Sequence, residues 1–318
     1  MTQPTTEAVG DDIRIERTHG LSHITLTRPR ARDRLTTQML DAVQQGTAGA
    51  DRVEIRGEGE RGFCAGADVR LLREIAMDDP HAAGDWLEHE YVVDATVAAL
   101  PGETHLHGIS MGGGLGMSIR QHVSARDDLV LAMPEVGIGL WPDVGMTFEL
   151  SRAPRLVGRH LAMTGASIDA PSALWAGLVD EVVDAQERPV QVDASASQLA
   201  RDSSWIQECY DCADPLEVVS RLQQHPDPRA HEAAQLIATR CPLSVAVALE
   251  AVLRAEEATS LAQVLATDTA LGHAFTADSD FAEGVRAQLV DKDRTPHWSH
   301  ASLADVPRRR VEQMFDGV

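Results

Sequence analysis

Two carboxylates and a run of glycines are the residues of this chain whose types and spacing could do chemistry. Glu135 and Asp143 lie in a glycine- and proline-rich segment, residues 133–145, and residues 112–114 just before it are three consecutive glycines. Glycine has no side chain, so a ligand can come close to its backbone N–H groups. The first N–H groups of a helix also lack an internal partner and can hold an anion or a developing oxyanion. We therefore expect the glycine run to stabilise an oxyanion and the carboxylates to perform proton transfer or nucleophilic attack.

Other readings of the glycine run fit the sequence less well. The dinucleotide-binding pattern G-x-G-x-x-G with its ribose-binding acid is missing, and no Gly-Lys-Ser/Thr follows as in a phosphate-binding loop. A second glycine-bearing turn, residues 62–68, precedes a helix expected to begin near Val69, which Asp68 could cap. Each turn alone is more often a plain connection than a site, so the functional interpretation depends on both.

The composition limits the possible partners. The chain has 318 residues, enough for one large or two modest domains, and a net charge of -21. This acidity argues against nucleic acid or an anionic membrane as a general partner. No uncharged apolar run approaches the ~18 residues that span a membrane, and residues 1–10 lack the basic and apolar regions of a signal peptide. We expect a cytoplasmic protein that acts on a small molecule.

The cysteines and the neighbouring histidines do not indicate a metal or redox site. Cys209 and Cys212 have C-x-x-C spacing, but no second ligand pair accompanies them. His105 and His107 alternate along an expected strand without a third ligand at a suitable spacing, so we interpret both as structural. We expect no bound metal, and two ordinary thiols at the C-x-x-C positions.

The apolar pattern predicts a mixed α/β fold. Strands are expected at residues 12–17, 21–27, 52–57, 104–108, 122–125 and 129–133. Helices are expected at residues 36–45, from about 69, at 85–100, at 112–121, and between 147 and 183 before a short strand. Further helices are expected at residues 215–224, 230–239, 243–255, 261–273 and 281–289. We divide the chain into a flexible N-terminal tail (residues 1–11), an α/β core (residues 12–190) and a helical C-terminal region with a polar tail (residues 191–318).

Four separated segments, in the same order, resemble one protein family. Residues 63–69 (FCAGADV), 107–114 (HGISMGGG) and 133–145 (MPEVGIGLWPDVG) resemble the enoyl-CoA hydratase/isomerase, or crotonase, superfamily. Residues 280–298 (DFAEGVRAQLVDKDRTPHW) resemble the C-terminal signature of its 3-hydroxyisobutyryl-CoA hydrolase branch. The resemblance extends over about residues 12–300, nearly the whole chain.

The resemblance implies a crotonase (ClpP/crotonase-like) fold of repeated β-β-α units with a helical C-terminal region. Members of the family hold the thioester oxygen of an acyl-CoA with two backbone N–H groups, which by motif position belong here to Ala67 and Gly113. Coenzyme A arrives as part of the substrate, so no separate cofactor is expected, and relatives suggest a homo-oligomer. Contacts to coenzyme A are expected from six residues: Arg28, Arg30, Arg32, Ala65, Asp68 and Lys292.

The choice of chemistry depends on which carboxylates are present. Hydratases of the superfamily carry a catalytic glutamate three residues after the second oxyanion-hole glycine, where this chain has Gly116. Addition of water across a double bond would lack half of its acid–base pair. The hydrolase branch resembles this chain at its expected substrate-binding residues, Glu90, Gly113, Glu135 and Asp143. A lone glutamate on a helix is usually solvated, so the expectation for Glu90 comes from the resemblance alone.

The resemblance therefore implies a catalytic pair, Glu135 and Asp143. Glu135 would attack the thioester carbonyl or activate water for that attack, and both alternatives stay open. Asp143 would orient the water or the substrate hydroxyl, and Glu90 would contact the hydroxyl end of the substrate. The expected reaction is hydrolysis of a short branched 3-hydroxyacyl-CoA, as for 3-hydroxyisobutyryl-CoA in valine breakdown. The alternatives are an enoyl-CoA hydratase or isomerase acting on another acyl-CoA, or a catalytically silent acyl-CoA-binding protein.

Overall fold

The computed structural model describes residues 5–8 and 12–317. The chain folds into two compact units. The first, called the sheet unit, comprises the described residues up to Asp68, His89–Ala132 and Ile168–Ser197. The second, called the helical unit, comprises Val69–Glu88, Met133–Ser167 and the described residues from Gln198 onward. The units interleave along the chain, whereas the division expected from the sequence was consecutive, with its boundary at residues 190 and 191.

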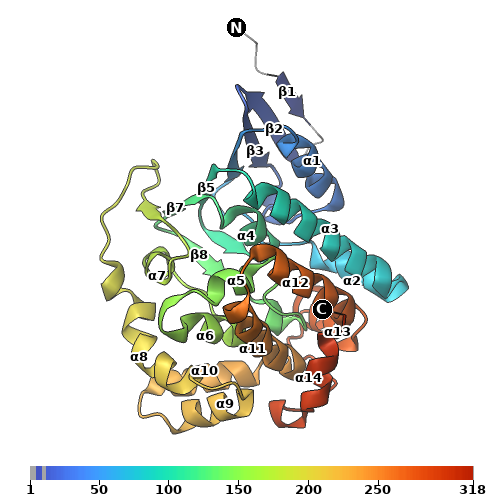
Figure 1. Ribbon diagram of the computed structural model, residues 1–318, viewed down its shortest axis with the longest axis vertical. Coiled ribbons are helices and arrows are strands. Elements are labelled where there is room, and N and C mark those ends of the chain that lie inside the picture. Colours follow the sequence, from blue (N-terminus) through green and yellow to red (C-terminus); the bar gives the residue numbers. More distant parts are fainter. Residues whose placement is uncertain (1–4, 9–11, 318) are drawn as a thin grey trace. The chain divides into compact units, whose positions relative to one another are not determined.

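A seven-stranded sheet is the framework of the sheet unit in the described part of the chain (Figure 1). The strands lie in the order β1-β2-β3-β4-β5-β7-β9. Strands β1, β2 and β3 pair in antiparallel fashion, and each pair from β3 to β9 is parallel. The bounds are β1 Thr5–Ala8, β2 Ile13–Thr18, β3 Leu21–Leu26, β4 Arg52–Gly57, β5 Gly102–Leu106, β7 His122–Arg126 and β9 Glu181–Val183.

The alternation of apolar residues along these strands explains the register of the sheet. Successive side chains of a strand point to opposite faces, so one face can be apolar throughout. Ile13 and Ile15 of β2 are buried and lie opposite Leu26 and Ile24 of β3, and Ile24 in turn lies beside Ile55 of β4. The buried residues of neighbouring strands therefore form one continuous apolar layer.

The remaining elements of the sheet unit repeat a β-β-α pattern. Strand β5 is followed by β6 (Ile109–Met111) and helix α4 (Gly113–Ser118), and β7 is followed by β8 (Val130–Ala132). The first strand of each pair joins the large sheet, and the second strands, β6 and β8, pair in parallel with each other. Helices α1 (Thr37–Thr47) and α7 (Ala170–Ala176) complete the unit, together with α3 (Pro80–Ala98) from His89 onward. This arrangement matches the repeated units expected from the resemblance.

The helical unit consists of helices that pack around α11 (Pro242–Glu257), most of whose residues are buried. Helix α11 contacts α5, α6, α9 and α14. Several of these helices begin at an aspartate or serine whose side chain accepts a backbone N–H, as at Asp214, Asp227 and Ser260. The other bounds are α2 Val69–Asp78, α5 Met146–Leu150, α6 Val157–Thr164, α8 Gln198–Tyr210, α9 Pro215–Gln224, α10 Pro228–Ala238, α12 Leu261–Thr276, α13 Ser279–Val285 and α14 Arg308–Met314.

The structure corrects several expectations about the elements. Helix α3 begins at Pro80, five residues before the expected residue 85, and helix α8 occupies a segment in which no helix was expected. The polar C-terminal tail contains helix α14, in which Val311 and Met314 are buried, because one face of this charged helix packs on α11. Part of the expected N-terminal tail, Thr5–Ala8, pairs with β2 as an edge strand, while residues 1–4 and 9–11 of that tail lie outside the described residues.

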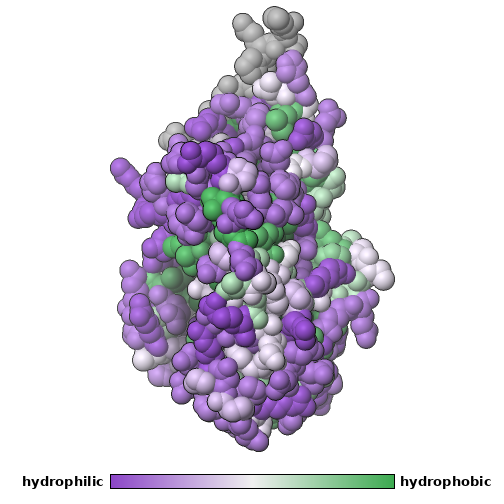
Figure 2. Space-filling view, turned by 90° about the vertical axis from the view of Figure 1, so that its left-hand side faces the viewer, coloured by the Kyte–Doolittle hydropathy of each residue, from purple (hydrophilic) through white to green (hydrophobic). Residues whose placement is uncertain are grey.

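Hydrophilic residues cover most of the face drawn in Figure 2, in keeping with the net charge of -21. Among the described residues, no single helix is both long and apolar enough to cross a membrane. Helices α10 and α11 satisfy such a test only when taken together, and they are bent by 117° at the break between them.

Candidate active site

The two glycine turns lie side by side in the sheet unit. Short bridges join Gly62 to Gly108 and Cys64 to Ser110, so the turns run next to each other. A Cβ atom placed on Gly66 would lie 3.3 Å from the backbone nitrogen of Gly113. The backbone of the first turn therefore reaches the beginning of α4.

Each turn offers a backbone N–H group that no other group occupies. Within the described residues, neither the N–H of Ala67 nor that of Gly113 has a hydrogen-bond acceptor. Gly112, just before α4, has φ 55° and ψ −137°, a conformation that residues with a side chain rarely adopt. Unoccupied N–H groups on adjoining turns are the kind of donors that stabilise an oxyanion.

Glu90 fills the space beside Gly113. Its side chain projects from α3 and is only 1% exposed, in contrast to the solvated position usual for a helical glutamate. A Cβ atom on Gly113 would lie 1.9 Å from Oε1 of Glu90 and 3.3 Å from Cδ1 of Leu35. The carboxylate therefore occupies the volume that any larger residue at position 113 would need.

Asp33 is a buried acid that the sequence reasoning did not single out. It is fully buried, has φ 50°, and its Oδ2 has no hydrogen-bond partner among the described residues. Burial raises the pKa of Asp33 to about 7, although a backbone hydrogen bond from Arg28 acts in the opposite direction. The carbonyl of Asp33 accepts a hydrogen bond from the thiol of Cys64 at 3.0 Å, beside the first glycine turn. The sequence contained one indication of this residue, since Asp33 is the only acid in an arginine-rich loop, residues 28–34, called the arginine loop.

The arginine loop is bound to the first glycine turn by backbone hydrogen bonds. The N–H of Ala65 donates to the carbonyl of Arg32 at 2.9 Å, and the N–H of Leu35 donates to the carbonyl of Gly66 at 2.9 Å. In a third hydrogen bond, the N–H of Asp68 donates to the carbonyl of Leu35 at 3.0 Å. Residues 31 to 33 positions apart in the sequence thus form one local surface.

The residues expected to contact coenzyme A differ in whether their side chains already form ion pairs within the protein. Arg28 is already engaged, with its Nε 3.3 Å from a carboxylate oxygen of Asp12, and Asp68 forms a 3.8 Å ion pair with Arg34. Arg30 and Arg32 are exposed and have no ion pair with any described residue. These two side chains are therefore the ones free to meet phosphate groups.

Lys292 belongs to the helical unit. It is exposed, has φ 60°, and stands between Asp291 and Asp293. Both of these carboxylates form ion pairs with Arg286, at 2.7 and 2.6 Å. The loop is thus held by Arg286 and presents the lysine at the surface.

The two predicted catalytic carboxylates are neighbours in the helical unit. Glu135 opens a short 3₁₀ turn, Glu135–Gly137, and its carbonyl accepts hydrogen bonds from the N–H groups of Ile138 and Leu140. The carbonyl of Asp143 accepts one from the N–H of Met146, at the start of α5. Both side chains are buried, with exposed fractions of 8% for Glu135 and 6% for Asp143.

Burial disfavours ionisation of the Glu135 carboxyl group. The pKa of Glu135 is raised well above its ordinary value, first by burial and then by the negative charge of Asp143. Its Oε2 atom has no hydrogen-bond partner in the described part of the chain. Once it has lost its proton, a buried carboxylate with a raised pKa is a stronger base than an ordinary one, which suits a general base or a nucleophile.

Asp268 holds the loop that carries these carboxylates. Its side chain, on α12, is buried and accepts hydrogen bonds from Nε1 of Trp141 at 3.0 Å and from the N–H of Gly145 at 2.7 Å. The ring of Trp141 stacks on Phe275 with centroids 5.0 Å apart. Asp268 was not among the residues expected at the site, although it is the only acidic residue of α12.

The C-terminal signature supports the same loop from another direction. A Cβ atom on Gly139 would lie 2.4 Å from the carbonyl oxygen of Asp280, and one on Gly284 would lie 2.4 Å from the backbone of Ile138. The buried carboxylate of Asp280 accepts hydrogen bonds from the N–H and hydroxyl of Ser299, at 2.7 and 2.8 Å. Glycines 139 and 284 therefore allow the backbone of α13 to approach the loop closely.

Comparisons with known proteins agree with this description. The enoyl-CoA hydratase/isomerase family profile matches residues 21–194 and 185–315. The chain is 29% identical to the mitochondrial 3-hydroxyisobutyryl-CoA hydrolase of Gallus gallus, over 96% of this chain and 88% of that protein. Among solved structures, it is similar to a carnitinyl-CoA dehydratase from Mycobacterium thermoresistibile, with a TM-score of 0.91, 34% identity and 97% of each chain covered.

A second solved structure has a similar fold. An enoyl-CoA hydratase from Rhodobacter sphaeroides superposes with a TM-score of 0.88, at 30% identity over 96% of this chain and 97% of that one. The crotonase fold expected from the motifs is thereby confirmed, as is the likeness to the hydrolase branch. The chain belongs to the enoyl-CoA hydratase/isomerase family, whose members act on acyl-CoA substrates.

Proposed function

We propose that this protein hydrolyses the thioester of a short branched 3-hydroxyacyl-CoA, with 3-hydroxyisobutyryl-CoA as the substrate to test first. The N–H groups of Ala67 and Gly113 would stabilise the oxyanion that forms at the thioester carbonyl. Glu135 would supply the base or the nucleophile, and Asp143 would orient the attacking water or the substrate hydroxyl. The roles follow the order of the family motifs. The backbone donors and the carboxylates each have, within their own unit, the local chemistry that their proposed role requires.

Two routes are compatible with the chemistry of Glu135. As a base, its carboxylate would take a proton from water while the hydroxide adds to the carbonyl carbon. As a nucleophile, it would add to that carbon itself and form an anhydride, which water would hydrolyse afterwards. In both routes the carbon–sulfur bond breaks when the tetrahedral intermediate collapses, and the thiolate of coenzyme A leaves and takes up a proton.

The observation that carries the proposal is the pairing of a buried, base-like Glu135 with Gly116. Gly116 is buried in α4, at the motif position where a hydratase has its second glutamate. Hydration of a double bond needs one group to deliver water and another to protonate the neighbouring carbon. Thioester hydrolysis needs one base or nucleophile and an oxyanion hole. The carboxylates present therefore favour hydrolysis over the hydratase and dehydratase reactions named for the similar solved structures.

Arg30 and Arg32 fit the role of phosphate contacts for coenzyme A. They are exposed and lack ion pairs in the described part of the chain, and the loop that carries them is hydrogen-bonded to the turn containing Ala67. Arginine binds phosphate with two parallel N–H donors, so each side chain can hold one phosphate group in a defined orientation. We include both residues in the proposed substrate site.

The test is release of free thiol from 3-hydroxyisobutyryl-CoA, with hydration of crotonyl-CoA followed in parallel by absorbance. Glu135→Gln keeps the size of the side chain and removes its basicity, so thiol release should fall by about 10²–10⁴-fold. Glu232→Gln, at an exposed glutamate of α10, serves as the matched control and should behave as the wild type. A change in crotonyl-CoA absorbance without thiol release would overturn the proposal and favour a hydratase despite Gly116.

A further inference from the structure

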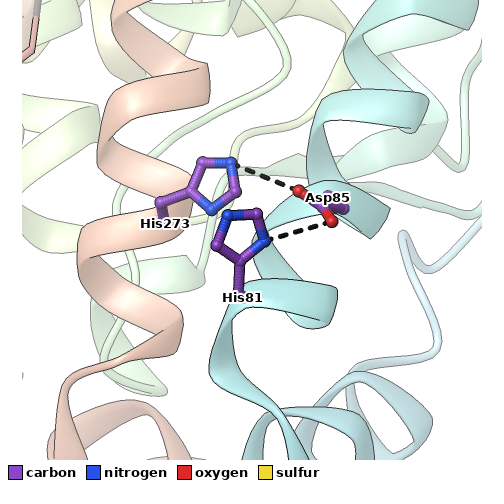
Figure 3. A group of neighbouring side chains, drawn as sticks. All are labelled: His81, Asp85 and His273. Carbon is purple, nitrogen blue, oxygen red and sulfur yellow. Dashed lines mark hydrogen bonds and ion pairs between the residues drawn. The ribbon is translucent and has the colours of Figure 1, made fainter.

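Two histidines and an aspartate of the helical unit form a cluster that plays no part in the proposed reaction. His81 and Asp85 lie near the beginning of α3, and His273 lies on α12. Figure 3 shows both imidazole rings facing the carboxylate of Asp85 from two different helices. All three side chains are accessible from solvent, with exposed fractions of 77% for His81, 57% for Asp85 and 31% for His273.

The distances within the cluster are close to those of a metal site. Nδ1 of His81 lies 3.1 Å from one oxygen of Asp85, and Nε2 of His273 lies 3.7 Å from the other. One ligand atom from each residue can be chosen so that all three lie within 4.8 Å of one another. Ligands about 2.0–2.2 Å from a tetrahedral zinc ion are roughly 3.3–3.6 Å apart, so small side-chain rotations would suffice.

The fold prepares this geometry in two ways. Residues four apart on a helix share one face, which places His81 and Asp85 together. Gly84, on the same helix, makes room for the third ligand, because a Cβ atom there would lie 2.1 Å from Nδ1 of His273. The hydroxyl of Thr276 on α12 donates to the carbonyl of Pro80 at 3.0 Å and fixes the two helices to each other.

We propose that His81, Asp85 and His273 form a binding site for a divalent transition-metal ion, of which Zn²⁺ is the best match. Two imidazole nitrogens and one carboxylate oxygen are ligands that Zn²⁺, Co²⁺ and Ni²⁺ accept, whereas Mg²⁺ and Ca²⁺ prefer oxygen alone. Water can complete the coordination because the cluster is open to solvent. Glu88 adds a second negative charge, with its carboxylate 4.0 Å from Nε2 of His273.

A bound ion would join α3 to α12 within the helical unit. Ligands from helices far apart in the sequence come together only in the folded chain, so the ion stabilises the folded state by mass action. Saturating Zn²⁺ should therefore raise the melting temperature of the protein. Without an ion, the same side chains would form only weak surface ion pairs.

The direct experiment is calorimetric titration of untagged, chelator-treated full-length protein with ZnCl₂, repeated with CoCl₂ and followed by visible absorbance. One ion should bind per chain, and Co²⁺ should give the visible bands of a site with nitrogen and oxygen ligands. His81→Ala and His273→Ala should each weaken Zn²⁺ binding at least tenfold and remove the rise in melting temperature. Mg²⁺ at the same concentration should cause no such rise.

Two further variants make the result specific. His122→Ala is the matched control, since its ring lies 3.5 Å from carboxylate oxygens of Asp180 and Glu181 in the sheet unit and should leave Zn²⁺ binding unchanged. Gly84→Ala should weaken binding although it replaces none of the three ligand residues, because its methyl group displaces the ring of His273. Zn²⁺ binding that survives both His81→Ala and His273→Ala, or that disappears in His122→Ala, would refute the site. Thiol release by His81→Ala should match the wild type, which separates this test from that of the hydrolase.

Discussion

The contact between Gly113 and Glu90 makes Gly113→Ala the most informative substitution in the sheet unit. The new methyl carbon would lie 1.9 Å from Oε1 of Glu90, whereas ordinary contact begins at 3.4 Å. The φ angle of Gly113 lies outside the left-handed region, so alanine can adopt the backbone conformation and keep the N–H of residue 113 in place. The substitution therefore displaces a carboxylate while it preserves the expected oxyanion donor.

The size of the effect follows from the displacement. The carboxylate of Glu90 must retreat by about 1.5 Å to restore ordinary contact, and misplacing a group by ~1 Å can reduce a rate about 10²-fold. We expect kcat/KM for 3-hydroxyisobutyryl-CoA to fall about 10²-fold, equivalent to ~2.7 kcal/mol of transition-state stabilisation. Overpacking costs about 1–3 kcal/mol, and the preference of a helix for alanine over glycine, about 1 kcal/mol, offsets part of it, so we expect the variant to stay folded.

The assay is a double-mutant cycle on thiol release, with Gly113→Ala, Glu90→Ala and the double variant. Shortening Glu90 removes the atoms that the new methyl group would strike. If the damage acts through Glu90, adding Gly113→Ala to the Glu90→Ala background should cost less than threefold. Urea unfolding of each variant checks that the fold is intact. Full activity in Gly113→Ala, or an equally large loss in the Glu90→Ala background, would refute this reasoning.

Three further predictions concern the helical unit and the four cysteines. Because the pKa of Glu135 is raised, the unfolded chain releases this proton at lower pH than the folded chain, so stability falls as pH rises above the ordinary carboxyl range. Glu135→Gln should therefore raise the melting temperature, by more at pH 8 than at pH 5.5, and a difference independent of pH would contradict the assignment. Asp268→Ala should cost about 2–5 kcal/mol in urea unfolding, because the buried N–H groups of Trp141 and Gly145 lose their acceptor; Ala266→Ser on the same helix should stay within ~0.5 kcal/mol. A thiol reagent should label only Cys212 in the native protein, and slowly, since the other three cysteines are buried and burial raises every thiol pKa. All four cysteines should react in denaturant, and rapid labelling of Cys212 in the native protein would argue against this.

The sequence was sufficient for most of the secondary structure. The strands of the large sheet other than β1, the helix that begins after Thr36 and most C-terminal helices follow from apolar alternation and from capping residues, which are local properties. Helices α8 and α14 were missed because their polar composition conceals a narrow apolar face that only packing reveals. The fold family followed from four motifs whose order could be read directly.

For the candidate site, the sequence named the groups, and the tertiary structure decided their environment. Gly113, Glu135 and Asp143 could be identified from glycine conformation and motif position, and the catalytic roles assigned to them remain predictions. The burial of Glu90 and the raised pKa of Glu135 could not be predicted, because both depend on what surrounds a side chain after folding.

The same reason explains the residues that the sequence did not indicate at all. Asp268 supports a loop more than 120 positions earlier in the chain, and His273 meets Asp85 only because Gly84 leaves room between two helices. Residue types, local periodicity and motif order can be read from the sequence; they determine the fold and indicate the class of substrate. Burial, charge coupling and the meeting of distant side chains exist only in the folded chain, where packing sets the dielectric surroundings and the distances.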